Sequence, residues 1–428
     1  MSGLKVSIVC LMFVFQCDFI AQVQKDTLKI TQEQADQLFL NNNLQLLASR
    51  FNIGASEAAI VQARLWDNPN ITVEQNIYNQ YTKKYFDITA TGNTGIQIQQ
   101  LFKLAGKRNK QIKLASISKE IAEFTFYDLI RSLKYELHSD FNDLFYLHQS
   151  LKFYDESIPT VRNTINSLEG VYENHSILLS EILRLKSLLF SLENDRLTLI
   201  NQISELENDL SVLINDKSSV NKYYFPELKS EKIDYTTPDN LKPDSLVVIA
   251  IENRADYKIA KATVKSDEIN LQLQKALSVP DITVAGIWSR QGSYIYDYYA
   301  LQFSIDLPIF NRNQGNILLS QNNLDADSKL LEQTKLNIER EVKNAYNKAV
   351  EIERFYKSFD KKFTAEYSNM ISGVLANYQK RYITIIEFTD FYESYRNSVV
   401  QMNQLQNSRT DAFENLNYKV GTDVIKYQ

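Results

Sequence analysis

The chain has little cysteine, glycine, proline and histidine, and each shortage narrows the class of protein it can be. Its 428 residues include only 2 cysteines, 11 glycines, 7 prolines and 3 histidines. So little glycine and proline, beside 44% apolar residues, excludes a collagen-like or disordered chain. Both cysteines, Cys10 and Cys17, lie in the first 21 residues. If that segment is removed, disulfides do not contribute to the stability of the mature protein.

The sequence also lacks the motifs of common enzymes and of nucleic-acid-binding proteins. It has no phosphate-binding loop, nucleophile elbow, paired-cysteine site or HExxH motif. His138, His148 and His175 are spaced by 10 and 27 residues, which does not place them on one helix face as metal ligands, so we expect surface or packing positions. A net charge of -5 gives no basic surface for nucleic acid. We therefore expect no catalytic residues, no metal site, no cofactor and no nucleic-acid partner.

The beginning of the chain is typical of a secretory signal peptide. Lys5 precedes an apolar run from Val6 to Phe15, and the small residue Ala21 follows. We predict a signal peptide over residues 1–21; a buried helix or a lipidated Cys17 are the alternatives. No later stretch approaches the ~18 consecutive apolar residues of a membrane-spanning helix. The exported protein is therefore expected to be periplasmic, secreted or a β-barrel.

An internal repeat organises the rest of the chain. Three features recur in the same order at nearly the same offset. Pro69–Val73 recurs 211 residues later as Pro280–Val284, and Ile98–Arg108 recurs 207 residues later as Ile305–Gly315. The pair Tyr172 and Glu181 recurs 206 residues later as Tyr378 and Glu387. Chance similarity does not explain this order. The pattern predicts a first repeat over residues 22–215, an irregular linker over 216–243, and a second repeat over 244–428.

Each repeat changes from a helical to a strand-like period. Residues Thr31–Trp66 are helical in pattern, and Thr31 with Gln34 forms a capping-box signature. Two alternating runs follow, Ile71–Tyr78 and Phe86–Gln100. In the second repeat the alternation places apolar residues on one face and polar residues on the other: Tyr299, Leu301, Phe303, Ile305 and Leu307 against Gln302, Ser304 and Asp306. Each repeat therefore supplies two strands with one apolar and one polar face.

Very long helices are predicted after the strands, over Gly106–Tyr172 and Arg312–Tyr378. Apolar residues recur every seven positions on the first of them and on the helix that returns from it: Ile130, Leu137, Leu144, Leu151 and Ile158, then Leu185, Leu192, Leu199, Leu206 and Leu213. Such spacing indicates coiled-coil packing. At 1.5 Å per residue, the first helix spans about 100 Å. Pro159 is expected to kink or interrupt it.

Four strands of this kind are too few to close around water. Three chains supply twelve strands, and closure removes the exposed sheet edges. A closed barrel with an apolar outside and a polar lumen is the sheet arrangement that spans a bilayer. We predict an α/β membrane protein, in which a homotrimer forms a twelve-stranded outer-membrane β-barrel continued by a long periplasmic coiled-coil barrel. The alternative is a small periplasmic sheet packed on a helical domain.

Several segments resemble the signatures of the TolC outer-membrane factor family. These are Asn42–Leu46, Gln62–Ile71, Leu307–Arg312, and Tyr378–Asp390, which is similar to the family's helix-hairpin tip. The resemblance covers essentially the whole mature chain, in the order and spacing of these segments. It implies a twelve-helix periplasmic tunnel that docks to a periplasmic adaptor protein and, through it, to an inner-membrane pump. Arg381 and His175 stand where the family usually has glycine at the two hairpin turns, which leaves the geometry of both tips open.

The resemblance also indicates where a pore constriction would lie. Glu387 and Asp390, three residues apart on one helical face, match the family's inward-facing acidic constriction and would favour cations. Glu181 corresponds to Glu387 across the repeat, while Arg184 replaces the counterpart of Asp390. The alternative for these carboxylates is an ordinary solvated helix face.

The helix tips supply further candidates for gating or adaptor contact. These are Tyr172, Tyr378, Arg184 and Arg381, with an ion pair from Arg184 to an acid of a neighbouring tip as one hypothesis. Packing at a helix end is the alternative for both tyrosines.

We expect from this resemblance a passive efflux channel in the outer membrane, with a large periplasmic portion, for metal cations or small toxic compounds. A periplasmic tethering protein and a duct for secreted polypeptides are the alternatives. The overall layout is slightly closer to the heavy-metal efflux branch of the family, but no Met, His or Cys cluster indicates a metal cargo.

Overall fold

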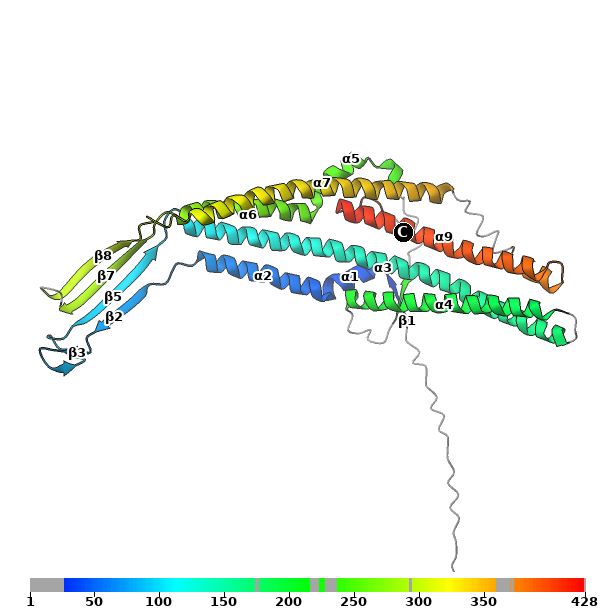
Figure 1. Ribbon diagram of the computed structural model, residues 1–428, viewed down its shortest axis with the longest axis horizontal. Coiled ribbons are helices and arrows are strands. Elements are labelled where there is room, and N and C mark those ends of the chain that lie inside the picture. The colour runs from blue at the N-terminus through cyan, green and yellow to red at the C-terminus, as the bar shows by residue number, and fades with distance from the viewer. Residues whose placement is uncertain are drawn as a thin grey trace, which may run out of the picture.

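The protein is elongated, with a sheet at one end and hairpin tips of long helices at the other (Figure 1). The computed structural model describes residues 27–173, 177–215, 223–227, 237–291, 295–358, 370 and 373–426. The predicted signal peptide, with Cys10 and Cys17, lies outside this range, as does His175. None of the helices within it is both long and apolar enough to cross a membrane.

The two repeats supply helices in the same order. The first contains α1 (Gln32–Asn42), α2 (Leu44–Arg64), α3 (Lys107–Glu173) and α4 (Leu179–Ile214). The second contains α5 (Pro243–Asn253), α6 (Ala255–Leu277), α7 (Gln314–Ser358) and α9 (Ile385–Val420). Both α1 and α5 have 11 residues and begin 211 positions apart, the offset of the repeated proline segments. The predicted tandem repeat is confirmed.

The first predicted helix is divided in two. Asn43 leaves the helical conformation, with φ -59° and ψ 123°, and its side chain accepts hydrogen bonds from the backbone N–H groups of Gln45 (3.0 Å) and Leu46 (3.1 Å). An asparagine in this role ends α1 and caps α2. The predicted capping box of Thr31 and Gln34 opens α1 as expected.

The longest helix, α3, has 67 residues and continues through Pro159. Its predicted length is confirmed, while the predicted interruption at the proline is wrong. Proline costs a helix about 3 kcal/mol through one lost hydrogen bond and a steric clash. The neighbouring residues Ile158 and Val161 are buried, 7% and 0% exposed, and their packing holds the helix together across that position.

Four strands form one antiparallel sheet in the order β2-β5-β7-β8. They are β2 (Asn70–Gln75), β5 (Thr94–Phe102), β7 (Ile282–Gln291) and β8 (Tyr296–Ile305). The register aligns residues of similar polarity in rows across the four strands. One face carries the row Ile71, Ile98, Gly286 and Leu301 and the row Val73, Ile96, Trp288 and Tyr299. The other face carries the row Asn70, Gln99, Ala285 and Gln302. The predicted apolar and polar faces are confirmed.

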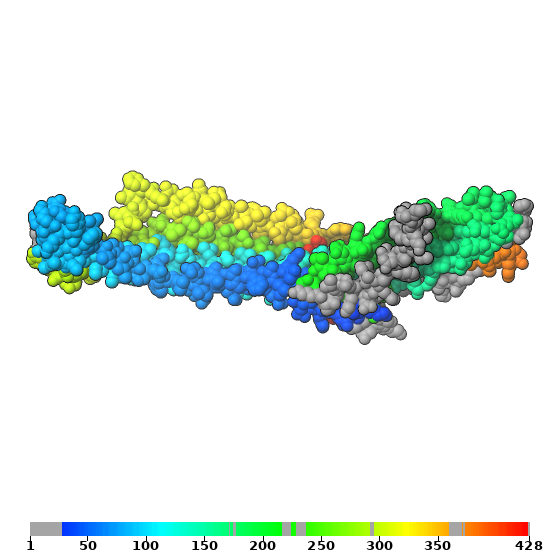
Figure 2. All heavy atoms as spheres, turned by 90° about the horizontal axis from the view of Figure 1, so that it is seen from below, coloured from blue at the N-terminus to red at the C-terminus, as the bar shows by residue number. Residues whose placement is uncertain are grey.

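Residues 76–93, predicted in part as strand, instead form a compact connection at the end of the molecule (Figures 1 and 2). A small hairpin, β3 (Tyr78–Asn79) with β4 (Lys84–Tyr85), lies within it. The buried carboxylate of Asp87 accepts hydrogen bonds from surrounding side chains, those of Asn79, Thr82, Thr89 and Thr91. These bonds, led by that of Thr89, hold the pKa of Asp87 well below its usual range. The connection is therefore organised around one internal charge.

The linker is not wholly irregular. Its residues Tyr223–Glu227 form β6, which pairs in parallel with β1 (Thr27–Thr31). A short 3-10 helix, η2 (Pro238–Asn240), precedes α5. Tyr224 explains the departure from the prediction, because it is 1% exposed and belongs to the central core.

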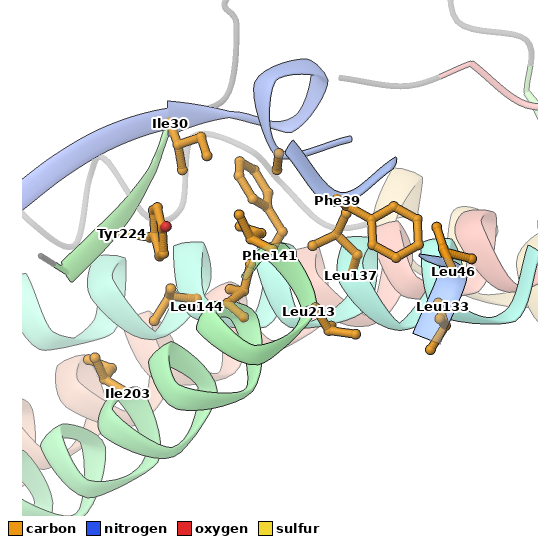
Figure 3. Close-up of a cluster of buried hydrophobic side chains, with 13 residues drawn as sticks. Ile30, Phe39, Leu46, Leu133, Leu137, Phe141, Leu144, Ile203, Leu213 and Tyr224 are labelled. Atoms are coloured by element: carbon orange, nitrogen blue, oxygen red, sulfur yellow. The ribbon is translucent and has the colours of Figure 1, made fainter. Parts of the chain in front are cut away.

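Two large clusters hold the helices of the first repeat. The central cluster surrounds Phe39, Leu137, Phe141, Leu144 and Leu213 (Figure 3). A second cluster, called here the tip cluster, lies toward the hairpin ends and contains Phe153, Tyr154, Ile158, Val161, Ile165, Leu185, Leu188, Leu192, Val374, Tyr378, Phe388 and Tyr392. Residues of the predicted seven-residue seams lie in or against these clusters, which confirms coiled-coil packing.

Candidate pore constriction and helix tips

The candidate residues gather at the end of the molecule opposite the sheet (Figure 1). Two elements meet there: the hairpin of α3 and α4, and the turn that leads from residues 373–379 into α9. Burial of the tip cluster fixes these elements against one another. Side chains outside that cluster are left to face solvent, a pore or a partner.

Glu387 is exposed and also opens α9. Its carboxylate accepts hydrogen bonds from the backbone N–H (2.7 Å) and hydroxyl (2.9 Å) of Thr384, and the Glu387 N–H donates to that hydroxyl (3.2 Å). This is a capping box. The bonds from Thr384 lower the pKa of Glu387, so the group remains ionised. Sequence reasoning missed this structural role, although Thr384 three residues before Glu387 is its signature.

Asp390 is also exposed, and the helical period places it on the same side of α9 as Glu387. Phe388 and Tyr392, 0% and 4% exposed, point into the tip cluster from the other side. The structure thus brings the two carboxylates together on an uncovered face, one turn from the start of the helix.

Tyr378 is not an exposed latch in the protomer. It is 5% exposed and its ring stacks on Phe388 with centroids 4.8 Å apart. Burial, with a further contribution from the charge of Glu181, raises the pKa of Tyr378 to about 12, and Arg381 opposes the shift. Among the described residues its buried hydroxyl has no hydrogen-bond partner. The structure therefore brings Glu181, Tyr378 and Arg381 together around a packed tyrosine.

Glu181, the α4 member of this group, lies in the first turn of that helix and is half-buried. The two remaining candidates are exposed: Tyr172, 38% exposed near the end of α3, and Arg184, on the second turn of α4. Whether Arg184 reaches an acid of another protomer stays a prediction.

Arg381 occupies a left-handed backbone conformation, with φ 64°. The N–H of Arg381 donates to the carbonyl of Tyr378 (2.9 Å), and that of Tyr382 donates to the carbonyl of Asn377 (2.8 Å). This is the hydrogen-bond pattern of a Schellman helix end, whose left-handed residue is usually glycine. An arginine therefore adopts here the backbone conformation that glycine usually takes at a helix end.

Replacing Arg381 by glycine is expected to raise the free energy of unfolding of the tip by about 0.5–1 kcal/mol, because the relieved strain exceeds the entropy that glycine loses. Slower amide exchange at residues 380–384 measures the gain. Arg381→Ala is the control, since it removes the guanidinium and keeps the left-handed strain; equal exchange in the two variants would assign the effect to charge.

A buried charged group in the middle of the molecule was missed at the sequence level. His138 is 7% exposed, and its ring nitrogens lie 2.8 Å from carboxylates on two other helices, Asp36 of α1 and Glu414 of α9. The expected packing position is correct, but its charge was not foreseen, because both partners are more than a hundred residues away. His148 packs on the ring of Phe225, as expected of a packing residue.

No group of three or more His, Cys, Asp or Glu residues in the described part of the chain is placed to hold a metal ion. For the acidic candidates at the tip, the structure therefore gives their charge and exposure, and it gives no metal-binding geometry among the described residues.

Comparison with known proteins gives a consistent result. Residues 35–215 match the family model described as outer membrane efflux protein. No curated protein matches the sequence. Among solved structures, a membrane protein from Pseudomonas aeruginosa superposes with a TM-score of 0.75 at 15% identity, covering 91% of this chain and 90% of the other.

Two further structures are similar over comparable lengths. The CmeC outer membrane channel of Campylobacter jejuni gives a TM-score of 0.74 at 12% identity, covering 99% of this chain and 94% of its own. The outer membrane protein VceC of Vibrio cholerae gives 0.71 at 16% identity, covering 91% and 96%. The fold is shared along almost the entire chain.

Proposed function

We propose that this chain is one protomer of a passive trimeric efflux channel in the outer membrane. Its residues 35–215 match the outer membrane efflux protein family. The chain has the fold of TolC-type outer membrane factors along almost its entire length. It catalyses no reaction in this role. The observation that carries the proposal is the two-faced sheet at the end of helices long enough to reach far into the periplasm.

The sheet supports closure by three copies. In one chain β2 and β8 are the outer strands of the sheet, and no other strand of the described residues pairs with their outer edges. Joining β8 of one protomer to β2 of the next removes every edge and gives twelve strands in three copies. The rows of Ile71 and Val73 then face lipid, while the row of Asn70, Gln99 and Gln302 lines a wet lumen.

The helices support a tunnel that continues the barrel. Besides the packing of α3 on its neighbours, large apolar side chains remain exposed on helices at both margins of the protomer, including Phe51 on α2 (79%) and Leu318 on α7 (64%). Exposed large apolar residues along the margins of a helical layer favour burial against another copy of the chain.

The tips carry the proposed constriction and the proposed docking surface. Glu387 and Asp390, with Glu181 nearby in the first turn of α4, place negative charge at the narrow end of the tunnel. Three copies give six carboxylates from Glu387 and Asp390, which favour cations. Exposed apolar residues at the same end, Leu178 (68%), Tyr382 (75%) and Ile386 (59%), would bind a periplasmic adaptor, through which the channel serves an inner-membrane pump.

The test replaces both carboxylates by their amides, Glu387→Gln and Asp390→Asn, and measures ion selectivity in planar bilayers. Glutamine retains the capping box, so the helix start is preserved while the charge is removed. We expect the cation-over-anion permeability ratio to fall on the order of tenfold, because the acidic ring no longer concentrates cations.

Glu393→Gln is the matched control, since it removes one carboxylate further along the same helix. An unchanged ratio in the double variant would remove Glu387 and Asp390 from the constriction. Release of the wild-type protein from membranes by alkaline wash without detergent would instead contradict the channel and favour a periplasmic tether.

In this proposal the inner-membrane pump, rather than this chain, selects the cargo. We propose export of metal cations or small toxic compounds within a tripartite system, on the strength of the efflux family over residues 35–215. Polypeptide cargo, which needs the same fold, is distinguished by which pump copurifies with the channel after crosslinking.

A further inference from the structure

Both tryptophans of the chain lie under an arginine side chain. Trp66 and Trp288 are the chain's 2 tryptophans. The guanidinium of Arg108 lies 4.4 Å from the ring centre of Trp66, and that of Arg290 lies 5.9 Å from the ring centre of Trp288. In each pair the guanidinium also donates to a backbone carbonyl, Arg108 to that of Arg64 and Arg290 to that of Ile88. The same arrangement therefore occurs twice.

The two pairs lie toward opposite ends of the strands, and the pair with Trp288 lies on the apolar face. Trp288 belongs to the row of Val73, Ile96 and Tyr299, and Arg290 follows it toward the 76–93 connection. Trp66 precedes β2 by four residues, at the end where the strands meet the helices. Trp66 is seven residues before Val73, which is at most about 23 Å along an extended chain at about 3.3 Å per residue. Because barrel strands are tilted by about 40°, this length covers about 18 Å of the membrane normal, within the apolar band of about 25 Å that two aromatic girdles flank in outer-membrane barrels.

The rows between the two tryptophans are apolar except at Gln100 and Gly286. They contain Ile71, Ile98, Gly286 and Leu301, then Gln100, Val284 and Phe303, then Phe102, Ile282 and Ile305. The two arginine–tryptophan pairs therefore bracket the apolar band, one at each boundary with water.

Among the residues that the structure describes, neither guanidinium is paired with a carboxylate. Both donate to neutral carbonyls and stack on neutral rings. Near Arg108, Asp67 is bound by Lys103 (3.0 Å) and Asp281 by Lys107 (2.6 Å). In the connection next to Arg290, Asp87 is enclosed by its own hydrogen bonds. Each guanidinium has further N–H donors in its plane that can bind an anion with several oxygens. In a membrane interface, the group with this chemistry is the lipid phosphate.

We propose that the two pairs are binding sites for the phosphate groups of membrane lipids, one in each leaflet. The tryptophan ring lies at the boundary of acyl chains and headgroups, and the arginine above it binds the phosphate. Charge complementarity and the spacing of the pairs identify lipid as the occupant. The inference rests on the proposed function, because it requires the sheet to lie in a bilayer.

The two tryptophans allow each site to be observed separately. Trp66→Phe leaves Trp288 as the sole tryptophan, and Trp288→Phe leaves Trp66. Each variant is reconstituted into vesicles of phosphatidylcholine and phosphatidylglycerol in which only one of the two lipids carries brominated chains, and quenching of tryptophan fluorescence is measured. We expect stronger quenching by brominated phosphatidylglycerol, because its phosphate has no choline cation beside it and the lipid keeps a net negative charge.

Arginine substitutions then test the assignment. Arg290→Gln is expected to reduce the preference of Trp288 for phosphatidylglycerol about fivefold, the effect of one interfacial basic residue, and to leave that of Trp66 unchanged. Arg108→Gln is expected to do the reverse. Arg340→Gln, an exposed arginine on α7, is the matched control for loss of one positive charge. Added inorganic phosphate is expected to have no effect, because the occupant is a lipid.

The outcomes separate this inference from the channel itself. Equal quenching by both brominated lipids, unaltered by either arginine substitution, would overturn the phosphate sites and leave the barrel intact. Competition by inorganic phosphate would replace lipid by a free anion and overturn the proposal as stated. Absence of quenching by either lipid would show that the sheet lies outside the bilayer, and both the inference and the proposed function would fail.

Discussion

Replacing His138 by alanine is expected to destabilise the protein by about 3–5 kcal/mol, the largest loss we foresee for one polar side chain. The ring lies between the carboxylates of Asp36 and Glu414, at 2.8 Å from each. Its removal leaves two carboxylates facing a partly buried space without the cation between them. The melting temperature of the detergent-solubilised protein measures the loss.

The stability supplied by His138 depends on pH in a defined direction. Hydrogen bonds to Asp36 and Glu414 outweigh burial and raise the pKa of His138 from 6.5 to about 9. A raised pKa gives stability that is fully present below about pH 6.5 and is lost as the pH rises through about 9. The wild-type melting temperature should therefore fall over this range, and His138→Ala should remove that part of the decline.

His148→Ala is the control for this prediction, because it truncates the same type of residue where no carboxylate pair is present. His148 contacts the ring of Phe225, and burial lowers its pKa. We expect a smaller loss of stability and a wild-type decline between pH 6.5 and 9. The same pH profile in His138→Ala as in wild type would contradict the role assigned to His138.

Replacing Phe388 by alanine is expected to destabilise the helix tip by about 3–5 kcal/mol. Phe388 is 0% exposed and its ring contacts Tyr378 and Tyr392 at centroid distances of 4.8 Å and 5.7 Å. The cavity removes the contact that fixes the first turn of α9. Amide exchange across residues 385–392 should accelerate at least a hundredfold.

The ion selectivity of the proposed channel should change as well, since the proposed constriction residues Glu387 and Asp390 lie on the first two turns of α9. Tyr382→Ala is the control: it removes an aromatic ring from the same tip, but one that is 75% exposed. Exchange in that variant should remain near wild type. If the amides of residues 385–392 are as well protected from exchange in Phe388→Ala as in wild type, contacts outside the tip cluster hold the turn.

Periodicity predicted the fold well because the decisive patterns are local. The seven-residue spacing of Leu185 and Leu192 reports directly on burial, and both are 0% exposed. The alternation along β8 similarly required only neighbouring residues. Where a single residue decided the outcome, prediction was weaker: Asn43 divides a helix through its side-chain bonds, and Pro159 is tolerated because its neighbours are buried.

The candidate site was predictable in position but not in contacts. The repeat and the family resemblance located Glu387, Asp390 and Tyr378 at the tip. Neither indicated that Tyr378 packs on Phe388 in the protomer or that Arg381 would adopt φ 64°. These properties depend on segments brought together by the fold, as does the pairing of His138 with residues of α1 and α9.

The 76–93 connection has a consequence for the outward end of the proposed channel. It joins β2 to β5 with 18 residues, whereas the hairpin of the second repeat joins β7 to β8 with residues 292–295 alone. A closed ring of three chains would thus carry three large lobes alternating with three connections of four residues. Each lobe is shaped by its own Asp87, independently of its neighbours. An antibody approaching from the medium would meet three identical, separate epitopes.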